Sequence, residues 1–354
     1  MKTITTDKWS LLALMRFALA AIVMVAHLEV HHLASLHVLS IIPHFGAFEA
    51  VLGFLLISGF SIGSSYRKEP DGFLKRRALR IYPVYIGALV LACIAVPQAF
   101  DLHLASTVLQ NLVFLNQITT DVSLVGPAWS LALEVWLYCL TPFLWRMQAS
   151  HLRVLMYASF AAYGCYELCR TLLNLPYYAG AGYGINLPVL AFPWLAGFLL
   201  AREPSMARRT VRDAALILFG HIALSAGVGF LYRIKHHQLA DFFTQDVIEF
   251  TARAITLAAV VMLFVWIVQG RTGSQKSSTM RLLGDTSYPL YLVHMPLFYI
   301  LASVGVHNEL VFVSAALPAA LLFYWCLDFY TRARERKPKV ASPITKATSF
   351  EASL

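Results

Sequence analysis

Long apolar segments recur along nearly the whole chain, and they constrain the possible folds more than any other feature of the sequence. Of the 354 residues, 58% are hydrophobic and only 13% are charged, whereas a soluble domain has about 25% charged residues. A chain with so few charges lacks the polar side chains that would cover a soluble fold of this size, so lipid must surround much of it. Each transmembrane helix needs about 20 residues, which leaves room for about ten spans.

We therefore predict an all-α, polytopic transmembrane helix bundle. The predicted spans lie near 9–30, 44–65, 81–98, 128–146, 152–172, 186–201, 211–232, 250–269, 286–306 and 310–330. The apolar segment 104–118 is shorter, and about 15 helical residues rise only about 22 Å. We expect it to form a half-buried helix that returns to the side from which it entered. Residues 1–330 would form one membrane domain, and 331–354 a basic, disordered tail.

The distribution of basic residues predicts the orientation of the bundle. The formal net charge is +9, and cytoplasmic loops of membrane proteins are rich in Lys and Arg. With the spans given above, 23 of the 28 Lys and Arg residues fall on one side, and only Arg233 and Lys235 fall on the other. Both termini are therefore expected in the cytoplasm. The charge is explained by topology, so we expect no nucleic-acid partner. We also expect the first span to be retained rather than cleaved as a signal peptide.

The cysteines predict neither a disulfide framework nor a metal site. All five lie in apolar segments, and Cys165 and Cys169 are spaced along one helix face rather than as a metal-binding CxxC pair.

Ionisable residues inside the predicted spans are the strongest indication of a functional site, because a charge in lipid is costly. Arg16 and His27 lie 11 residues apart in the first span, so they share one helix face about 16 Å apart along the axis. Arg16 could instead extend to the inner interface, and His27 alone could be an interfacial histidine. Glu134 lies one turn beyond Ser130 in the fourth span, and its carboxylate needs a partner such as His27 or an arginine. The alternative to a functional role for Glu134 is a buried pair that only stabilises the structure.

Two further groups of polar residues have a functional and a structural interpretation. Arg77 and Arg80 stand at i and i+3 where the third span begins, and guanidinium groups bind phosphate with two hydrogen bonds. Charge that only sets topology explains them equally well. Ser287, Tyr291 and His294 form a polar stripe in the ninth span, for which hydrogen bonding between helices is the structural alternative.

Taken in order, these residues resemble the motifs of the acyltransferase-3 family of membrane acyltransferases. The resemblance covers about residues 10–330. The matching residues are Arg16 and His27 with ten residues between them, Ser58-Gly59-Phe60, Arg77 with Arg80, Ile81 and Pro83, Trp129-Ser130-Leu131 with Glu134, Tyr138 and Pro142, and Ser287-Tyr288 through Tyr291-Leu292 to His294.

The resemblance implies a bacterial plasma-membrane enzyme that moves an acyl group, usually acetyl, from cytoplasmic acyl-CoA to a hydroxyl of a glycan or lipid-linked saccharide. On this basis we expect His27 to act as general base, Glu134 to orient it, Arg77 and Arg80 to bind the phosphates of CoA, and the pantetheine arm to pass Arg16. An acyl-imidazole intermediate is an open alternative to direct transfer. The expected substrate-binding residues are Trp129, Ser130, Tyr291 and His294.

A transporter or flippase for a lipid-linked glycan is the rival class. Polar residues within the spans would then line its transport path. Such a protein would need no acyl-CoA and commonly contains inverted repeats, which the sequence does not display. The sequence leaves the acceptor and the oligomeric state open.

Overall fold

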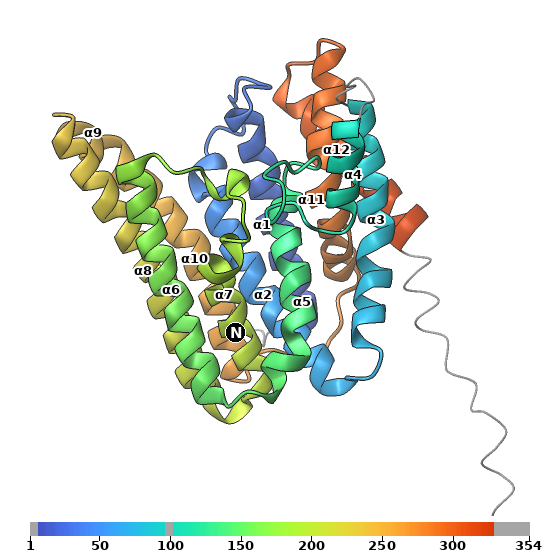
Figure 1. Ribbon diagram of the computed structural model, residues 1–354, viewed down its shortest axis with the longest axis vertical. Helices are drawn as coiled ribbons and strands as arrows, with labels where there is room; N and C mark the ends of the chain where they lie inside the picture. The colour runs from blue at the N-terminus through green and yellow to red at the C-terminus, as the bar shows by residue number, and fades with distance from the viewer. Residues whose placement is uncertain (1–5, 96–101, 329–354) are drawn as a thin grey trace, which may run out of the picture.

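Helices that run alternately up and down form a bundle (Figure 1). The structure, a computed structural model, describes residues 6–95 and 102–328. The helices are α1 (Lys8–Val30), α2 (Ala47–Lys68), α3 (Phe73–Ala95), α4 (Leu102–Leu112), α5 (Ala128–Arg146), α6 (Ala149–Leu173), α7 (Asn186–Arg202), α8 (Ala207–Lys235), α9 (Leu239–Asp241), α10 (Val247–Val268), α11 (Ser278–Ser303) and α12 (Glu309–Phe323). Short 3-10 turns lie at Pro43–Phe45, Tyr178–Gly180 and Pro204–Met206, and π-helical turns at Phe242–Asp246 and Tyr324–Asp328. The predicted all-α class is confirmed.

The long helices agree with the predicted multi-pass character. Within the described ranges, six helical segments are long and apolar enough to cross a membrane, namely Lys8–Val30, Ala47–Lys68, Phe73–Ala95, Pro204–Lys235, Leu239–Val268 and Glu309–Leu327. Helix α7 is apolar but shorter. Each of the ten predicted spans overlaps a helix, although α11 begins eight residues before its predicted span. The number of crossings and the side on which the termini lie remain predictions, and the predicted tail lies outside the described residues.

The segment predicted as a half-buried helix is shorter than expected. Helix α4 has 11 residues, which rise only about 16 Å, too little to cross the hydrocarbon core. The chain turns sharply at Phe114, whose φ is 58°. The buried side chain of Asn111 then binds the returning loop, because it donates to Val122 O and accepts from Leu124 N.

Basic residues gather at one end of the bundle. Loops 69–72, 147–148 and 203–206 lie at the lower end in Figure 1, and loops 31–46, 113–127 and 174–185 lie at the upper end. A backbone hydrogen bond of 2.8 Å from Asp7 N to Gln275 O places the segment before α11 at the lower end as well. We call the lower end the basic end, since it holds Arg67, Lys68, Arg76, Arg146, Arg202, Arg208 and Arg281.

Glycines bring the helices around the bundle centre into close contact. A Cβ atom on Gly59 would clash with the carbonyl of Trp194, and a Cβ atom on Gly197 would clash with the carbonyl of Leu56. Helices α2 and α7 therefore pack backbone to backbone, which small residues permit in membrane proteins. Gly284 gives α11 a similar close contact with α1. This packing fixes α1, α2 and α11 around a central cavity.

Candidate active site

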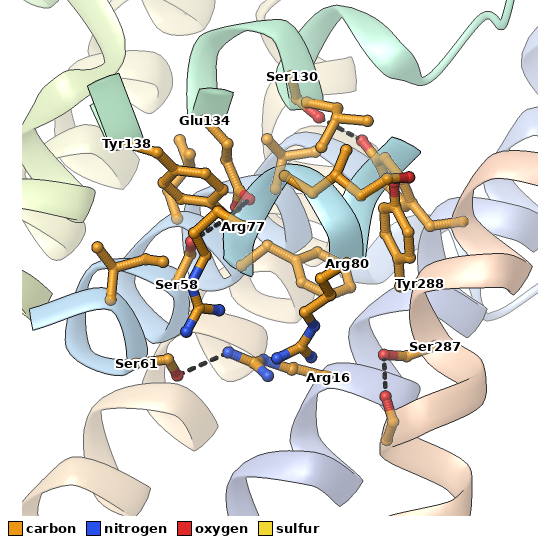
Figure 2. A pocket seen from close by; sticks show the side chains of 18 residues that line it. Arg16, Ser58, Ser61, Arg77, Arg80, Ser130, Glu134, Tyr138, Ser287 and Tyr288 are labelled. Carbon is orange, nitrogen blue, oxygen red and sulfur yellow. Dashed lines mark hydrogen bonds between the residues drawn. The ribbon is translucent and has the colours of Figure 1, made fainter. Parts of the chain in front are cut away.

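A cavity of about 130 Å³ lies between α1, α2, α3, α5 and α11 (Figure 2). It extends from residues near the basic end towards the middle of the bundle. Its lining combines three arginines and one carboxylate with serine and tyrosine hydroxyls on an apolar background. The lining residues are Arg16, Val51, Phe54, Leu55, Ser58, Ser61, Ile62, Arg77, Arg80, Ile81, Ser130, Leu131, Glu134, Tyr138, Gly284, Ser287, Tyr288 and Tyr291.

Three guanidinium groups meet on the wall of the cavity. Arg16 comes from α1, and Arg77 and Arg80 come from the first turns of α3. Figure 2 shows the three side chains directed towards one space. Arg16 donates a 2.6 Å hydrogen bond to Ser61, and Arg77 donates one of the same length to Ser65. The structure thus brings together the three residues predicted to bind the donor, and their positive field favours an anionic ligand.

Glu134 faces the same cavity from α5. The hydroxyl of Tyr138 donates to its carboxylate at 2.5 Å, and Ser58 lies 3.2 Å from the Tyr138 hydroxyl. The charges of Arg16 and Arg80 also attract this carboxylate. Of the two partners that the sequence left open, an arginine therefore fits, and the expected pairing of Glu134 with His27 is not formed. Glu134 and His27 do not pair because they lie at different depths. Glu134 lies deeper in the bundle, whereas His27 lies near the far end of α1.

His27 has a histidine partner on α11. Its Nδ1 lies 2.8 Å from Nε2 of His294, and the two ring planes differ by 17° with centroids 5.1 Å apart. The other nitrogen of His294, Nδ1, lies 2.9 Å from the carbonyl oxygen of Leu290. His294 is fully buried, whereas His27 is half-buried.

The hydrogen bonds of this pair determine where the protons lie when both rings are neutral. A carbonyl oxygen only accepts, so His294 carries its proton on Nδ1 and donates it to Leu290. Its Nε2 must then accept, and the donor to it is Nδ1–H of His27. A neutral imidazole carries one proton, which leaves Nε2 of His27 with a free lone pair. This nitrogen has the form that a general base requires.

Ser130 and Tyr291 stand between the cavity and the histidine pair. Their hydroxyls lie 2.7 Å apart, and Tyr291 also donates to Pro127 O at 3.2 Å. The ring of Tyr291 contacts the His294 ring, with 6.3 Å between centroids. His27 and His294 therefore lie on the far side of the Ser130 and Tyr291 side chains, which we call the wall. The cavity lining includes Arg16, Ser130 and Tyr291 but neither His27 nor His294, so the expected polar path from Arg16 does not extend to His27 in this structure.

The family model of the acyltransferase-3 family, described as an acyltransferase domain, matches residues 9–329 of the chain. The chain belongs to the acyltransferase-3 family. This confirms the resemblance and makes the chain a membrane acyltransferase, an enzyme that moves an acyl group from a donor to an acceptor. The rival class of transporter is thereby set aside. Neither the comparison with curated proteins nor that with solved structures gave a match.

The residues predicted to bind substrate occupy three different positions in this acyltransferase-3 protein. Ser130 and Tyr291 line the cavity. His294 instead contacts the proposed base, His27. Trp129 is buried in the core and does not line the cavity.

Three serines of α2 that hold side chains of the cavity were not predicted as site residues from the sequence. Ser58, Ser61 and Ser65 hold Tyr138, Arg16 and Arg77, respectively. Their spacing of i, i+3 and i+7 places them on one face of α2, and this periodic signal could have identified them. Within the described ranges, no group of three or more His, Cys, Asp or Glu side chains could hold a metal ion.

Proposed function

We propose that this acyltransferase-3 protein moves an acetyl group from cytoplasmic acetyl-CoA to a hydroxyl of a glycan or lipid-linked saccharide, in the plasma membrane of a bacterium. His27 is the general base. The observation that carries the proposal is the free Nε2 of His27, which His294 and Leu290 determine through their hydrogen bonds. Family membership supplies the acyl transfer, and the arginine cavity supplies a site for an anionic donor.

The donor enters at the basic end. CoA carries phosphate groups, which the planar guanidinium groups of Arg77 and Arg80 can bind with paired hydrogen bonds. Both residues lie in the first turns of α3, where the cavity is closest to the basic end. The narrow pantetheine arm then passes Arg16 and Glu134 towards Ser130 and Tyr291. The excess of positive charge at this end favours a cytoplasmic position for it.

The chemistry requires a proton to leave the acceptor. Nε2 of His27 takes the proton of the hydroxyl as its oxygen attacks the carbonyl carbon of the thioester. The carbon–sulfur bond breaks, and the CoA thiolate takes the proton from the imidazolium. The products are an ester and free CoA. General base catalysis of this kind contributes about 10²- to 10⁴-fold.

His294 stabilises the charged form of His27 during this step. The Nδ1–H of the imidazolium donates to Nε2 of His294 at the 2.8 Å distance that already exists, so little rearrangement is needed. An acyl-imidazole route would use the same free nitrogen as nucleophile, and the two routes remain alternatives.

The wall formed by Ser130 and Tyr291 must open before the thioester reaches His27. One hydrogen bond of 2.7 Å joins their side chains, and breaking such a bond costs about 1 kcal/mol. A rotation of the Tyr291 side chain would break this bond and open the wall. In the closed position this wall keeps bound acetyl-CoA away from the base.

The test separates donor binding from transfer. The full chain is purified in lipid nanodiscs, and CoA should raise its melting temperature, as expected for a ligand that binds only the folded state. His27→Ala should keep that rise while cells that express it lose acetyl groups on envelope glycans, as measured by mass spectrometry. Normal acetylation by a fully expressed His27→Ala variant would rule out His27 as the base, and no rise with CoA in the wild type would rule out this donor.

A further inference from the structure

A second pocket lies at the end of the bundle opposite to the basic end. It has a volume of about 670 Å³ and is formed by the loop after α1 and the turn before α12. Small-molecule sites typically have volumes of about 300–1,000 Å³. We call it the outer pocket. Its lining residues come from 32–38 and 307–310, and none of them belongs to the donor cavity.

The walls of the outer pocket are fixed by one carboxylate. Glu309 accepts hydrogen bonds from the backbone N–H groups of His37, Val38 and Leu39 at 3.1, 2.7 and 3.3 Å. Its side chain thereby fastens the loop after α1 to the first turn of α12. Asn308 caps the same helix through two backbone N–H groups. The pocket is therefore built before any ligand arrives, which favours binding because little ordering remains to be done.

The lining of the outer pocket combines polar and apolar side chains and, among the described residues, contains no Lys or Arg. His32, His37 and His307 are exposed and supply imidazole nitrogens, and Ser35 supplies a hydroxyl. The nitrogens of an imidazole ring can donate and accept hydrogen bonds. The one carboxylate of the lining, Glu309, is occupied by backbone N–H groups. Such a surface matches the many hydroxyl groups of an uncharged sugar better than it matches a phosphate.

The outer pocket adjoins the histidine pair. His31 precedes the first lining residue, and its ring lies 5.6 Å from the ring of His27 in an edge-on arrangement. Tyr299 on α11 holds His31 through a contact of 3.2 Å to Nδ1. Burial, together with the neighbouring His32, lowers the pKa of His31. One helical turn, about 6 Å, separates His27 from His31.

We propose that the outer pocket binds the acceptor, an uncharged saccharide, and directs one of its hydroxyl groups past His31 to Nε2 of His27. The inference rests on the function proposed above and adds the place and chemical class of the acceptor. Donor and acceptor then approach the base from opposite ends of the bundle. This arrangement keeps acetyl-CoA away from external water until an acceptor is bound.

Blocking the outer pocket covalently tests this proposal. Ser35→Cys places an exposed thiol on its wall, and a membrane-impermeant polyethylene glycol maleimide added to intact cells would attach a bulky group there. Gln245→Cys, at an exposed position in the turn Phe242–Asp246, provides a matched control at the same end of the bundle. Treated wild type accounts for reaction of the five native cysteines. Transfer is followed as radioactive acetate incorporated into alkali-labile esters of envelope glycans, and labelling is verified by intact mass.

The expected result is a loss of acetate incorporation on the order of tenfold or more in labelled Ser35→Cys, with untreated Ser35→Cys and labelled Gln245→Cys near wild type. The purified labelled protein should still be stabilised by CoA. Three outcomes would each overturn the assignment. They are undiminished incorporation after complete labelling, loss of the CoA effect together with loss of transfer, and no labelling from outside. Absence of incorporation in untreated wild type would instead refute the function on which the inference rests.

Discussion

Nδ1 of His27 lies 2.8 Å from Nε2 of His294, although the two residues are 267 positions apart in the chain. Helices α1 and α11 therefore bring two imidazole rings together as one hydrogen-bonded unit. The carbonyl of Leu290, 2.9 Å from the other nitrogen of His294, gives this unit a direction, because it can only accept a hydrogen bond. In the proposed mechanism His294 is thus a positioning residue for His27, whose Nε2 takes the proton.

Replacement of His294 should lower transfer without abolishing donor binding. In His294→Phe the ring volume is kept but the acceptor for Nδ1–H of His27 is lost, so both tautomers of His27 become available. We expect transfer to fall by about 10- to 100-fold, as is common for groups that orient a functional histidine. The measurement is the rate of glycan acetylation, with CoA-dependent thermal stabilisation as the control for folding.

His294→Gln serves as the conservative partner in this experiment. The carbonyl oxygen of a glutamine side chain can accept from Nδ1–H of His27, so part of the activity should return relative to His294→Phe. Equal activity of both variants would show that the ring acts only through packing.

Arg77→Ala should weaken donor binding. A hydrogen bond to a charged group contributes about 1.5–3 kcal/mol, which corresponds to about 10- to 150-fold in the dissociation constant of CoA. Arg208→Ala, an exposed arginine at the same end on α8, is the matched control for net charge. Binding can be followed by the shift of melting temperature with CoA concentration. Equal weakening in both variants would indicate general attraction by the basic end rather than a specific phosphate contact.

Much of the architecture could be predicted because its physical signals are local. Apolar runs of about 20 residues mark helices in lipid. Arg16 and Glu134 were identified because ionisable residues are costly there, and Arg77 and Arg80 because two arginines at i and i+3 can bind phosphate. All four line one cavity. Helix ends were less predictable, because α11 starts with the polar segment from Ser278, which hydropathy alone excludes.

Pairing between distant helices could not be predicted from these signals. The sequence left open whether His27 or an arginine would be the partner of Glu134, and it did not predict that His27 of α1 would contact His294 of α11. Helical spacing tells which residues share a face of one helix, but it carries no information about the rotation and depth of the neighbouring helix. The role of Ser130 and Tyr291 as a wall likewise depends on contacts between α5 and α11.

The close contact of α2 with α7 should be sensitive to volume. Gly197→Val would place a branched side chain against the carbonyl of Leu56, and overpacking of this kind costs about 1–3 kcal/mol or more. Gly227→Val is the control, because a Cβ atom there would have no neighbour within 4 Å. Thermal unfolding in nanodiscs should show a lower melting temperature for Gly197→Val alone. A comparable loss in both variants would mean that helix propensity, not packing, dominates.

The start of α1 should depend on pH through Asp7. Burial opposes ionisation of this carboxylate, but hydrogen bonds from Ser10 and Arg281 outweigh it and lower its pKa. The cap and the 2.8 Å ion pair with Arg281 therefore stabilise the fold at neutral pH. This contribution is lost as the pH falls through the ordinary pKa of about 4 and below.

Asp7→Ala should lower stability at pH 7 by about 0.5–2 kcal/mol, the usual effect of losing an N-cap. The difference from wild type should shrink progressively as the pH falls below about 4. Asp7→Asn keeps an acceptor for Ser10 and should lie between the two. A difference that is independent of pH would show that the charge of Asp7 contributes nothing.

Removal of the Tyr291 hydroxyl should test whether this side chain is a barrier or a participant. Tyr291→Phe loses the 2.7 Å bond with Ser130 and the 3.2 Å bond to Pro127 O but keeps the ring, so stability should fall by about 1–2 kcal/mol while transfer stays at or above the wild-type rate. Tyr288→Phe is the matched control, because it also loses a bond from the cavity lining, to Ile81 O. Tyr291→Ala should remove the barrier and increase hydrolysis of acetyl-CoA in the absence of acceptor. A fall in transfer of about 10²- to 10³-fold in Tyr291→Phe, with Tyr288→Phe unaffected, would instead identify the hydroxyl as a donor that stabilises the transition state.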